Sequence, residues 1–525
     1  MTDNAEIAEA SDRLRTESLS PTEVALDLAR PAVDAPARLD ETGVELKRGA
    51  ILNTIATLAS NFRGIFTFLV ARVLGPAALG TFSVAWANTD LASKIAVFGL
   101  DNAVTTFIAR SQATGDFVRS RTLFRAAVVL VLTQSTLVAA TGMTALQMFG
   151  DRLQFPRETL SALAFVLCAL PGIALYRVCT SISRGMKVMK HDIYSRGMTE
   201  PTITTLALLI ALGFGFTRVA PEVAAVSGTA ASGIVALIFA SRLFSGVTGR
   251  DTVSIWTEAK PLLAYGAPIS IYQMFNAFIL RLDVIMLGWF IGRAPGVTLA
   301  TVGVYSVTVG LASNLRKVNQ AFNPIFAPVV AGMTATGDQQ RAAATYARLA
   351  EWMLWILLPL VALMTLTGSV ILLIYGPAFR QGGAWLAILG IACATNAFVS
   401  LGETVIMVQR PHLNLLNSSV TCGVAFAANL WLIPRFGVMG AAFGVLLPYV
   451  IQGILRYGVL RLVFRWRNPW SSIRSPIVTT MIAFVPALMC RLFLDGIAGQ
   501  VIAGLVFIAI FGVGWSRHRR LAKPA

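Results

Sequence analysis

Apolar runs of membrane-spanning length follow one another from residue 49 almost to the end of this chain, and they restrict its fold more than any other feature. A helix needs about 20 residues to cross a hydrocarbon core roughly 30 Å thick. Backbone polar groups inside lipid must be satisfied within the segment, so such runs form helices. A hydrophobic fraction of 56% with 13% charged residues also indicates a chain that lies in lipid. We therefore predict an all-α polytopic membrane protein with about 14 spans, near residues 49–73, 78–100, 122–148, 159–182, 199–217, 221–245, 262–291, 300–331, 347–375, 383–409, 412–433, 437–463, 476–494 and 497–516.

The segment 1–46 differs from the rest of the sequence. It holds eleven acidic residues, few apolar ones and prolines at positions 21, 31 and 36. This composition predicts a disordered, solvated acidic tail. The segment also lacks a basic stretch followed by an apolar core, so we do not interpret it as a cleavable signal peptide.

Basic residues are distributed unevenly between the two sets of loops. The segments around Arg121, Lys190, Arg250 and Arg467, and the carboxy-terminal tail, carry most of the Lys and Arg residues, whereas the alternate loops carry few. The positive-inside rule places the basic set in the cytoplasm. We predict a multi-pass membrane protein with both termini cytoplasmic. The net charge of +17 then reflects topology, and no nucleic-acid partner is expected.

The sequence contains no pattern typical of an enzyme or a metal site. All five cysteines stand singly in apolar segments, and His191, His412 and His518 lie at polar edges. Neither a zinc site nor a histidine-assisted nucleophile is indicated. The loops are too short for a soluble catalytic domain. We expect no catalytic residue, no metal and no cofactor, and conclude that the function resides among the helices.

Two segments of the chain look like copies of each other. The first is "GAILNTIATLASNFRGIFTFLVARVLGPAALGTFSV" from Gly49, and the second is "GAPISIYQMFNAFILRLDVIMLGWFIGRAPGVTLATVGVYSV" from Gly266. Both begin Gly-Ala, reach an arginine after 14 or 15 residues and end in Gly-x-aromatic-Ser. The second copy begins six spans after the first, so the copies have the same orientation, as in two-lobed transporters. We predict lobes at 47–245 and 246–465, each of six helices, followed by two extra helices and a basic cytoplasmic tail at 466–525.

The arginines of the repeat, Arg63 and Arg281, lie inside the predicted spans. A charge at this depth costs at least a few kcal/mol unless it meets water or a partner. A structural arginine that snorkels or pairs internally is the alternative. Matched depth in both repeats favours a shared cationic cavity between the lobes.

Other charges within the predicted spans are also candidates for function. Asp90 and Lys94 stand four residues apart on one helix face, which favours a self-neutralising pair. Arg316 and Lys317 point to different sides of one helix, so at most one of them is expected to line the cavity.

Two further carboxylates are candidates for cation coupling or charge pairing. Asp283 follows Arg281 by two residues and is interpreted as a structural partner or a proton site. Glu403 has no basic residue one turn away and is the best lone candidate for cation coupling.

With the turn "RVLGPAALGTFSV", "IYGPAFRQGGAWLAILG" and "PHLNLLNSSVTCGVAFAANLWLIPRFGVMGAAFGVLLPYVI", the chain resembles the polysaccharide (Wzx-type) flippases of the multidrug/oligosaccharidyl-lipid/polysaccharide exporter superfamily. The resemblance covers about residues 47–465, and "LIPRFGVMGAA" is its most specific element. It implies a transporter of the inner (cytoplasmic) membrane with two six-helix bundles plus two extra helices. It further implies movement of undecaprenyl-diphosphate-linked oligosaccharide repeat units to the outer leaflet by alternating access. Arg63 and Arg281 match the family's diphosphate-binding cations, and Arg316 is a third candidate.

Other functions stay open at this point. A cation-coupled multidrug-type exporter of the same superfamily is expected to place carboxylates in the amino-terminal lobe, where only Asp90 is deep. A membrane glycosyltransferase or polymerase is expected to have a long loop or an acidic or histidine cluster at one face. Expected partners are the lipid-linked oligosaccharide, the lipid bilayer and, from the resemblance, polysaccharide polymerase or export proteins.

Overall fold

The computed structural model describes residues 63–153, 155–248, 254–335, 339–466, 470–494 and 496–521. Residues 51–525 form one compact unit. The predicted tail 1–46 lies outside the described residues, as does most of the predicted first span. The described residues form helices and turns with no strand, which confirms the all-α prediction.

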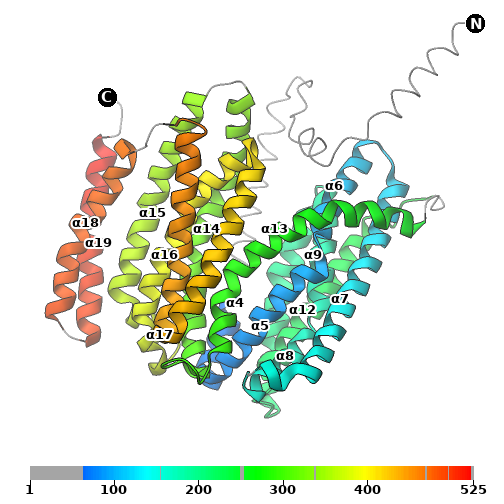
Figure 1. The fold of residues 1–525 in the computed structure, drawn as a ribbon, viewed down its shortest axis with the longest axis horizontal. Helices are drawn as coiled ribbons and strands as arrows, with labels where there is room; N and C mark the ends of the chain where they lie inside the picture. Colours follow the sequence, from blue (N-terminus) through cyan, green and yellow to red (C-terminus); the bar gives the residue numbers. More distant parts are fainter. Residues whose placement is uncertain are drawn as a thin grey trace, which may run out of the picture. The chain divides into compact units, whose positions relative to one another are not determined.

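Helices follow one another along the whole described chain (Figure 1). By length and composition, nine helices of the described part are able to cross a membrane, or ten if one bent pair is counted as a span. The polytopic prediction is thus confirmed, and the number 14 stays a prediction. The elements are α4 (Arg63–Leu69), η2 (Val70–Leu74), α5 (Gly75–Val97), α6 (Leu100–Ala113), α7 (Phe117–Leu153), α8 (Arg157–Leu167), α9 (Leu170–Gly185), α10 (Lys190–Asp192), η3 (Ile193–Thr199), α11 (Glu200–Gly213), α12 (Ala220–Arg242), α13 (Ile255–Trp289), α14 (Leu299–Ala335), α15 (Gln339–Leu373), η4 (Pro377–Gly382), α16 (Gly383–Gln409), α17 (Pro411–Leu462), α18 (Trp470–Phe493) and α19 (Gly496–Leu521).

The longest helix, α17, contains 52 residues and is broken at Gly437, whose φ is 56°. At about 1.5 Å per residue an unbroken helix of that length would be more than twice as long as the hydrocarbon core is thick. A left-handed φ favours glycine because it has no Cβ. The break falls at the first residue of the predicted span 437–463, just after the predicted span 412–433.

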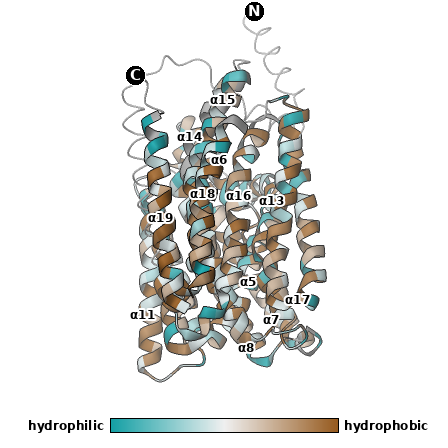
Figure 2. Ribbon diagram, turned by 90° about the vertical axis from the view of Figure 1, so that its left-hand side faces the viewer, coloured by the Kyte–Doolittle hydropathy of each residue, from teal (hydrophilic) through white to brown (hydrophobic). Residues whose placement is uncertain are grey.

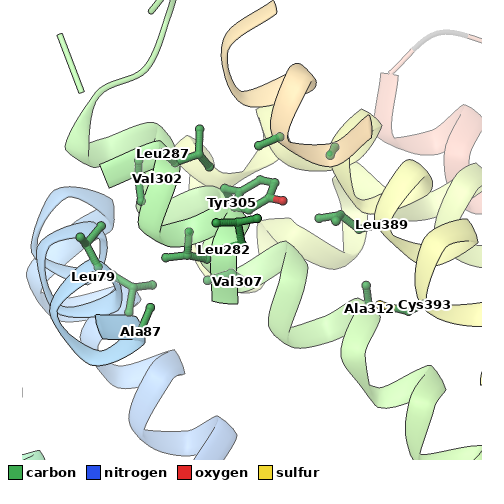
Figure 3. Close-up of a cluster of buried hydrophobic side chains, with 14 of the residues drawn as sticks. Leu79, Ala87, Leu282, Leu287, Val302, Tyr305, Val307, Ala312, Leu389 and Cys393 are labelled. Carbon is green, nitrogen blue, oxygen red and sulfur yellow. The ribbon is translucent and has the colours of Figure 1, made fainter. Parts of the chain in front are cut away.

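The helices pack in two sets that meet along α5. In the amino-terminal set, α9 packs against α6, α7 and α12, and α11 packs against α12. In the carboxy-terminal set, α16 packs against α14, α15 and α17, and α13 packs against α17. The helix α5 lies against both α13 and α14 and so joins the two sets (Figure 1). Figure 3 shows this junction, where Leu79 of α5 faces a cluster that includes Leu282 and Tyr305.

Two glycine pairs bring α5 and the turn after it into backbone contact with the second set. A Cβ on Gly80 would overlap Leu299 of α14, and a Cβ on Gly303 would overlap Pro76. Farther along, Gly99 contacts Gly266 of α13 in the same way. Gly80 and Gly303 begin the two Gly-x-aromatic-Ser copies, so the repeated segments touch each other at their matching glycines.

The last two helices form a separate pair. α18 and α19 pack against each other and against α15, with a small core that contains Leu366 and Phe507. Figure 2 shows hydrophobic residues along α19 and hydrophilic ones gathered near its upper end. Large exposed side chains such as Leu505 and Phe493 lie on these helices, as expected of a lipid-facing surface.

Candidate functional site

A cavity of about 1060 Å³ lies between the two helix sets. Its wall is built from α4, α5, α9, η3, α11 and α12 on one side and from α13 and α14 on the other. Both repeated segments therefore contribute to it. A site between two same-oriented repeats is the arrangement expected of a two-lobed transporter.

The cavity wall is strongly cationic. Six basic side chains line it against two carboxylates, Asp90 and Glu200, an excess of four positive charges. Such an excess in a cavity with low-dielectric walls attracts anions. The basic residues are Lys94 of α5, Arg177 of α9, Arg196 of η3, Arg281 of α13, and Arg316 and Lys317 of α14.

Asp90 is the centre of an ion triad that spans the two sets. Nη2 of Arg177 lies 3.1 Å from Asp90 Oδ1, and Nε of Arg281 lies 2.9 Å from Asp90 Oδ2. Each carboxylate oxygen thus accepts one charge-assisted hydrogen bond, and such bonds are stronger than neutral ones. The prediction of a self-neutralising Asp90–Lys94 pair is wrong, because the two form no ion pair and guanidinium groups from other helices take both oxygens.

Lys94 instead has a counterpart in the second repeat. Lys94 follows Gly80 by fourteen residues, and Lys317 follows Gly303 by fourteen residues. Both lysines line the cavity, one from each set. The repeat therefore supplies a second matched pair of cations, Lys94 and Lys317, which is separate from the proposed Arg63–Arg281 pair. The equal spacing from the two glycines is the sequence signal that reveals this pair.

Arg316 and Lys317 both line the cavity, so the expectation that at most one does is wrong. Arg316 donates from Nη1 to the Tyr449 hydroxyl at 3.2 Å. Adjacent helical residues diverge in direction, but long side chains on a wide wall reach the same cavity. Arg316 thus lies in the cavity wall, and its role in binding a diphosphate stays a prediction.

Arg63 begins α4, but its side chain lies outside the described residues. Its neighbours Gly64, Phe66 and Thr67 line the cavity. The pairing of Arg63 with Arg281 across the cavity stays a prediction.

The other two predicted carboxylates lie away from the cavity wall. Asp283 is buried and accepts a hydrogen bond of 2.8 Å from the Tyr305 hydroxyl. Glu403 is not lone, because Nη2 of Arg456 lies 2.9 Å from its Oε2 and the Tyr272 hydroxyl donates to its Oε1 at 2.8 Å. Arg456 comes from α17, far along the chain and not within one helical turn of Glu403, so local sequence spacing does not reveal the pair.

The sequence analysis did not predict Arg177 and Arg196 as site residues. Arg177 lies near the end of the predicted span 159–182, where an arginine is expected to reach the membrane surface. Helix packing turns it toward Asp90 instead. In the part of the chain that the structure describes, no group of three or more His, Cys, Asp or Glu residues is placed to hold a metal ion.

Two helix sets around a central polar cavity define a membrane transporter fold, and solved structures of that class are similar to this chain. A structure of the lipid II flippase MurJ in an inward closed conformation matches with a TM-score of 0.69 at 11% identity, covering 90% of this chain and 100% of that one. An inward-facing multidrug resistance MATE family transporter of the MOP superfamily matches with a TM-score of 0.61 at 15% identity, covering 79% and 98%. At these identities the likeness concerns the fold.

The chain belongs to the polysaccharide biosynthesis protein family, whose model matches residues 46–331. Two proteins of Haloferax volcanii are similar over most of their length. The "probable flippase AglR" is 25% identical over 83% of this chain and 87% of that protein. The "probable low-salt glycan biosynthesis flippase Agl15" is 21% identical over 78% and 83%. The resemblance to polysaccharide flippases of the exporter superfamily is thereby confirmed.

Proposed function

We propose that this flippase moves an undecaprenyl-diphosphate-linked oligosaccharide from the inner to the outer leaflet of the cytoplasmic membrane. The observation that carries the proposal is the cavity wall, with six basic side chains from both helix sets against two carboxylates. The names of the Haloferax relatives, as flippases and in one case of glycan biosynthesis, agree with it.

The diphosphate is the part of such a substrate that these cations recognise. Guanidinium groups present paired N–H donors that match phosphate oxygens, and lysine adds a point charge. Arg281 is 36% exposed at the side chain and bonded to Asp90 through Nε. In our proposal Arg281 and Arg316, together with Arg63, bind the diphosphate, and Lys94 and Lys317 add charge from the two repeats.

Alternating access is the proposed mode of movement. The helix α5 touches the second set at Gly80–Gly303, and the turn that follows α5 touches it at Gly99–Gly266. These contacts lie toward opposite ends of α5, with the cavity-lining residues between them. Opening one contact while the other stays closed would expose the cavity to one leaflet at a time.

A cation-coupled exporter needs a carboxylate that is able to exchange its cation. Asp90 already binds two arginines and Glu403 binds Arg456. These contacts favour an anionic substrate for the cavity over coupling through these carboxylates.

The test is transport of a lipid-linked oligosaccharide by the purified protein in liposomes, measured as the fraction that an external glycan-modifying enzyme reaches. We expect Arg63→Ala and Arg281→Ala each to lower the rate at least about tenfold, since each removes a charge-assisted contact. Arg281→Lys should retain partial activity, because it keeps the charge and loses the fork of donors. Arg435→Ala is the matched control, because Arg435 stacks on Trp431 outside the cavity. Full transport by the Arg63→Ala, Arg281→Ala double variant would refute the proposed site.

A further inference from the structure

The cavity has two chemically different ends along α5. Phe82, Trp86, Asp90 and Lys94 all line it, and they are spaced by four residues. Residues at this spacing share one face of a helix. The face is aromatic toward the Gly80 contact and charged toward the other end.

The aromatic end is a packed group rather than a single ring. The rings of Phe66 and Phe82 meet edge to face with centroids 5.3 Å apart. Phe82 in turn stacks on Trp86 at 5.9 Å with an interplanar angle of 23°. Phe66 and Phe82 are each 8% exposed, whereas Trp86 is half-buried. Phe82 therefore holds the indole in place while part of Trp86 faces the cavity.

Serine hydroxyls accompany the aromatic group from both helix sets. Ser83 of α5 and Ser306 of α14 line the cavity, each three residues after its repeat glycine. Among the described residues the Ser83 hydroxyl has no hydrogen-bond partner, and Ser306 donates to the Val302 carbonyl at 2.9 Å and keeps its lone pairs. The aromatic end thus offers a flat apolar face beside hydroxyl groups.

We propose that Trp86 and Ser83, with Ser306 opposite, form a subsite for the first sugar ring of the glycan. This inference rests on the proposed function and extends it from the diphosphate to the sugar. A pyranose has an apolar C–H face and a rim of hydroxyls. The C–H groups pack on the negative face of an aromatic ring, and the serines bond the rim.

The spacing along α5 fits a sugar joined directly to a diphosphate. At about 1.5 Å per residue, Trp86 lies roughly 6 Å along the helix from Asp90 and roughly 12 Å from Lys94. A ring stacked on Trp86 therefore places its anomeric phosphate beside the cations. An isoprenoid chain fits the indole but leaves Ser83 buried against a group that forms no hydrogen bond, which is unfavourable.

The experiment measures binding to the purified full-length protein by calorimetry. The probes are farnesyl diphosphate and farnesyl diphosphate carrying one glucose, one galactose or one N-acetylglucosamine. We compare Trp86→Ala and Trp86→Phe with the parent chain, and use Trp352→Ala as control because Trp352 is 57% exposed and outside the cavity. For each probe, the affinity of a variant is compared with that of the parent chain for the same probe, because the two kinds of probe differ in charge.

We expect Trp86→Ala to weaken binding of at least one glycosylated probe roughly five- to tenfold and to leave farnesyl diphosphate within about twofold. Trp86→Phe should retain most of the affinity, which also shows that the position tolerates substitution. Equal losses for all probes would assign Trp86 to the isoprenoid or to structure and overturn the subsite, as would no loss for any sugar. If the parent chain binds no diphosphate probe at all, the proposed function itself is wrong, and the subsite with it.

Discussion

The carboxylates of Asp90 and Glu403 are each bound by arginine from another helix, yet the two sites differ in their surroundings. Asp90 lines the cavity, where in the proposed function a substrate phosphate would compete for the same guanidinium groups. Glu403 lies outside the cavity wall, and its partner Arg456 is only 3% exposed. We infer that the contacts of Asp90 with its arginines are exchangeable and that the Glu403–Arg456 pair is structural.

This difference gives a prediction at the scale of single residues. Glu403→Gln should destabilise the protein, because it leaves the buried Arg456 charge without its partner. Removing one partner of a fully buried pair costs about 3–5 kcal/mol, and we expect less here because the Glu403 side chain is 25% exposed. The joint change Glu403→Leu, Arg456→Met should recover most of that loss and keep transport. Thermal unfolding and liposome transport measure the two effects, and a stable double variant without transport would instead make Glu403 a coupling site.

At the scale of elements, α5 carries most of the contacts between the helix sets. Its amino-terminal half meets α14 at Gly80–Gly303, and the turn after its end meets α13 at Gly99–Gly266. Backbone atoms form both contacts, so no side-chain rotation is able to make room for a methyl group. Glycine is required here for close approach, and for Gly99 also by its φ of 72°.

We predict that Gly303→Ala holds the cavity open at the Gly80 end and lowers transport at least about tenfold at unchanged protein amount. In a cysteine-free background, Ser306→Cys should then react faster with a membrane-impermeant thiol reagent from that side. Gly266→Ala should instead open the cavity at the Gly99 end, so that Ser306→Cys reacts more slowly with a reagent added from the Gly80 side. Gly423→Ala is the control, since a Cβ there meets nothing within 4 Å. Unchanged labelling in both variants would show that these contacts do not gate the cavity.

At the scale of the whole molecule, the orientation in the membrane rests on the Lys/Arg asymmetry. Lys190 and Arg152 are exposed and flank the α8–α9 pair at its two ends. We predict that in intact cells a cysteine at Arg152→Cys reacts with an impermeant reagent, whereas one at Lys190→Cys reacts only after permeabilisation. The reverse pattern would invert the proposed direction of transport.

The sequence by itself determined the class of fold. Apolar runs of spanning length form helices in lipid, because a helix satisfies its backbone polar groups within the segment. The duplicated segments predicted two lobes with a cavity between them, and Arg281 of the second segment lines the cavity that the structure contains. The Lys94–Lys317 pair was also present in the sequence, because both lysines stand at the same distance from their repeat glycines, Gly80 and Gly303.

Only the tertiary structure decided how the charges pair. Asp90 binds Arg177 and Arg281, 87 and 191 residues away in sequence, rather than its helical neighbour Lys94. Glu403 likewise binds Arg456 from another helix. Local spacing predicts which side chains share a helix face, but helix packing sets which faces meet. In a medium where an unpaired charge is costly, the partner brought close by packing takes the carboxylate.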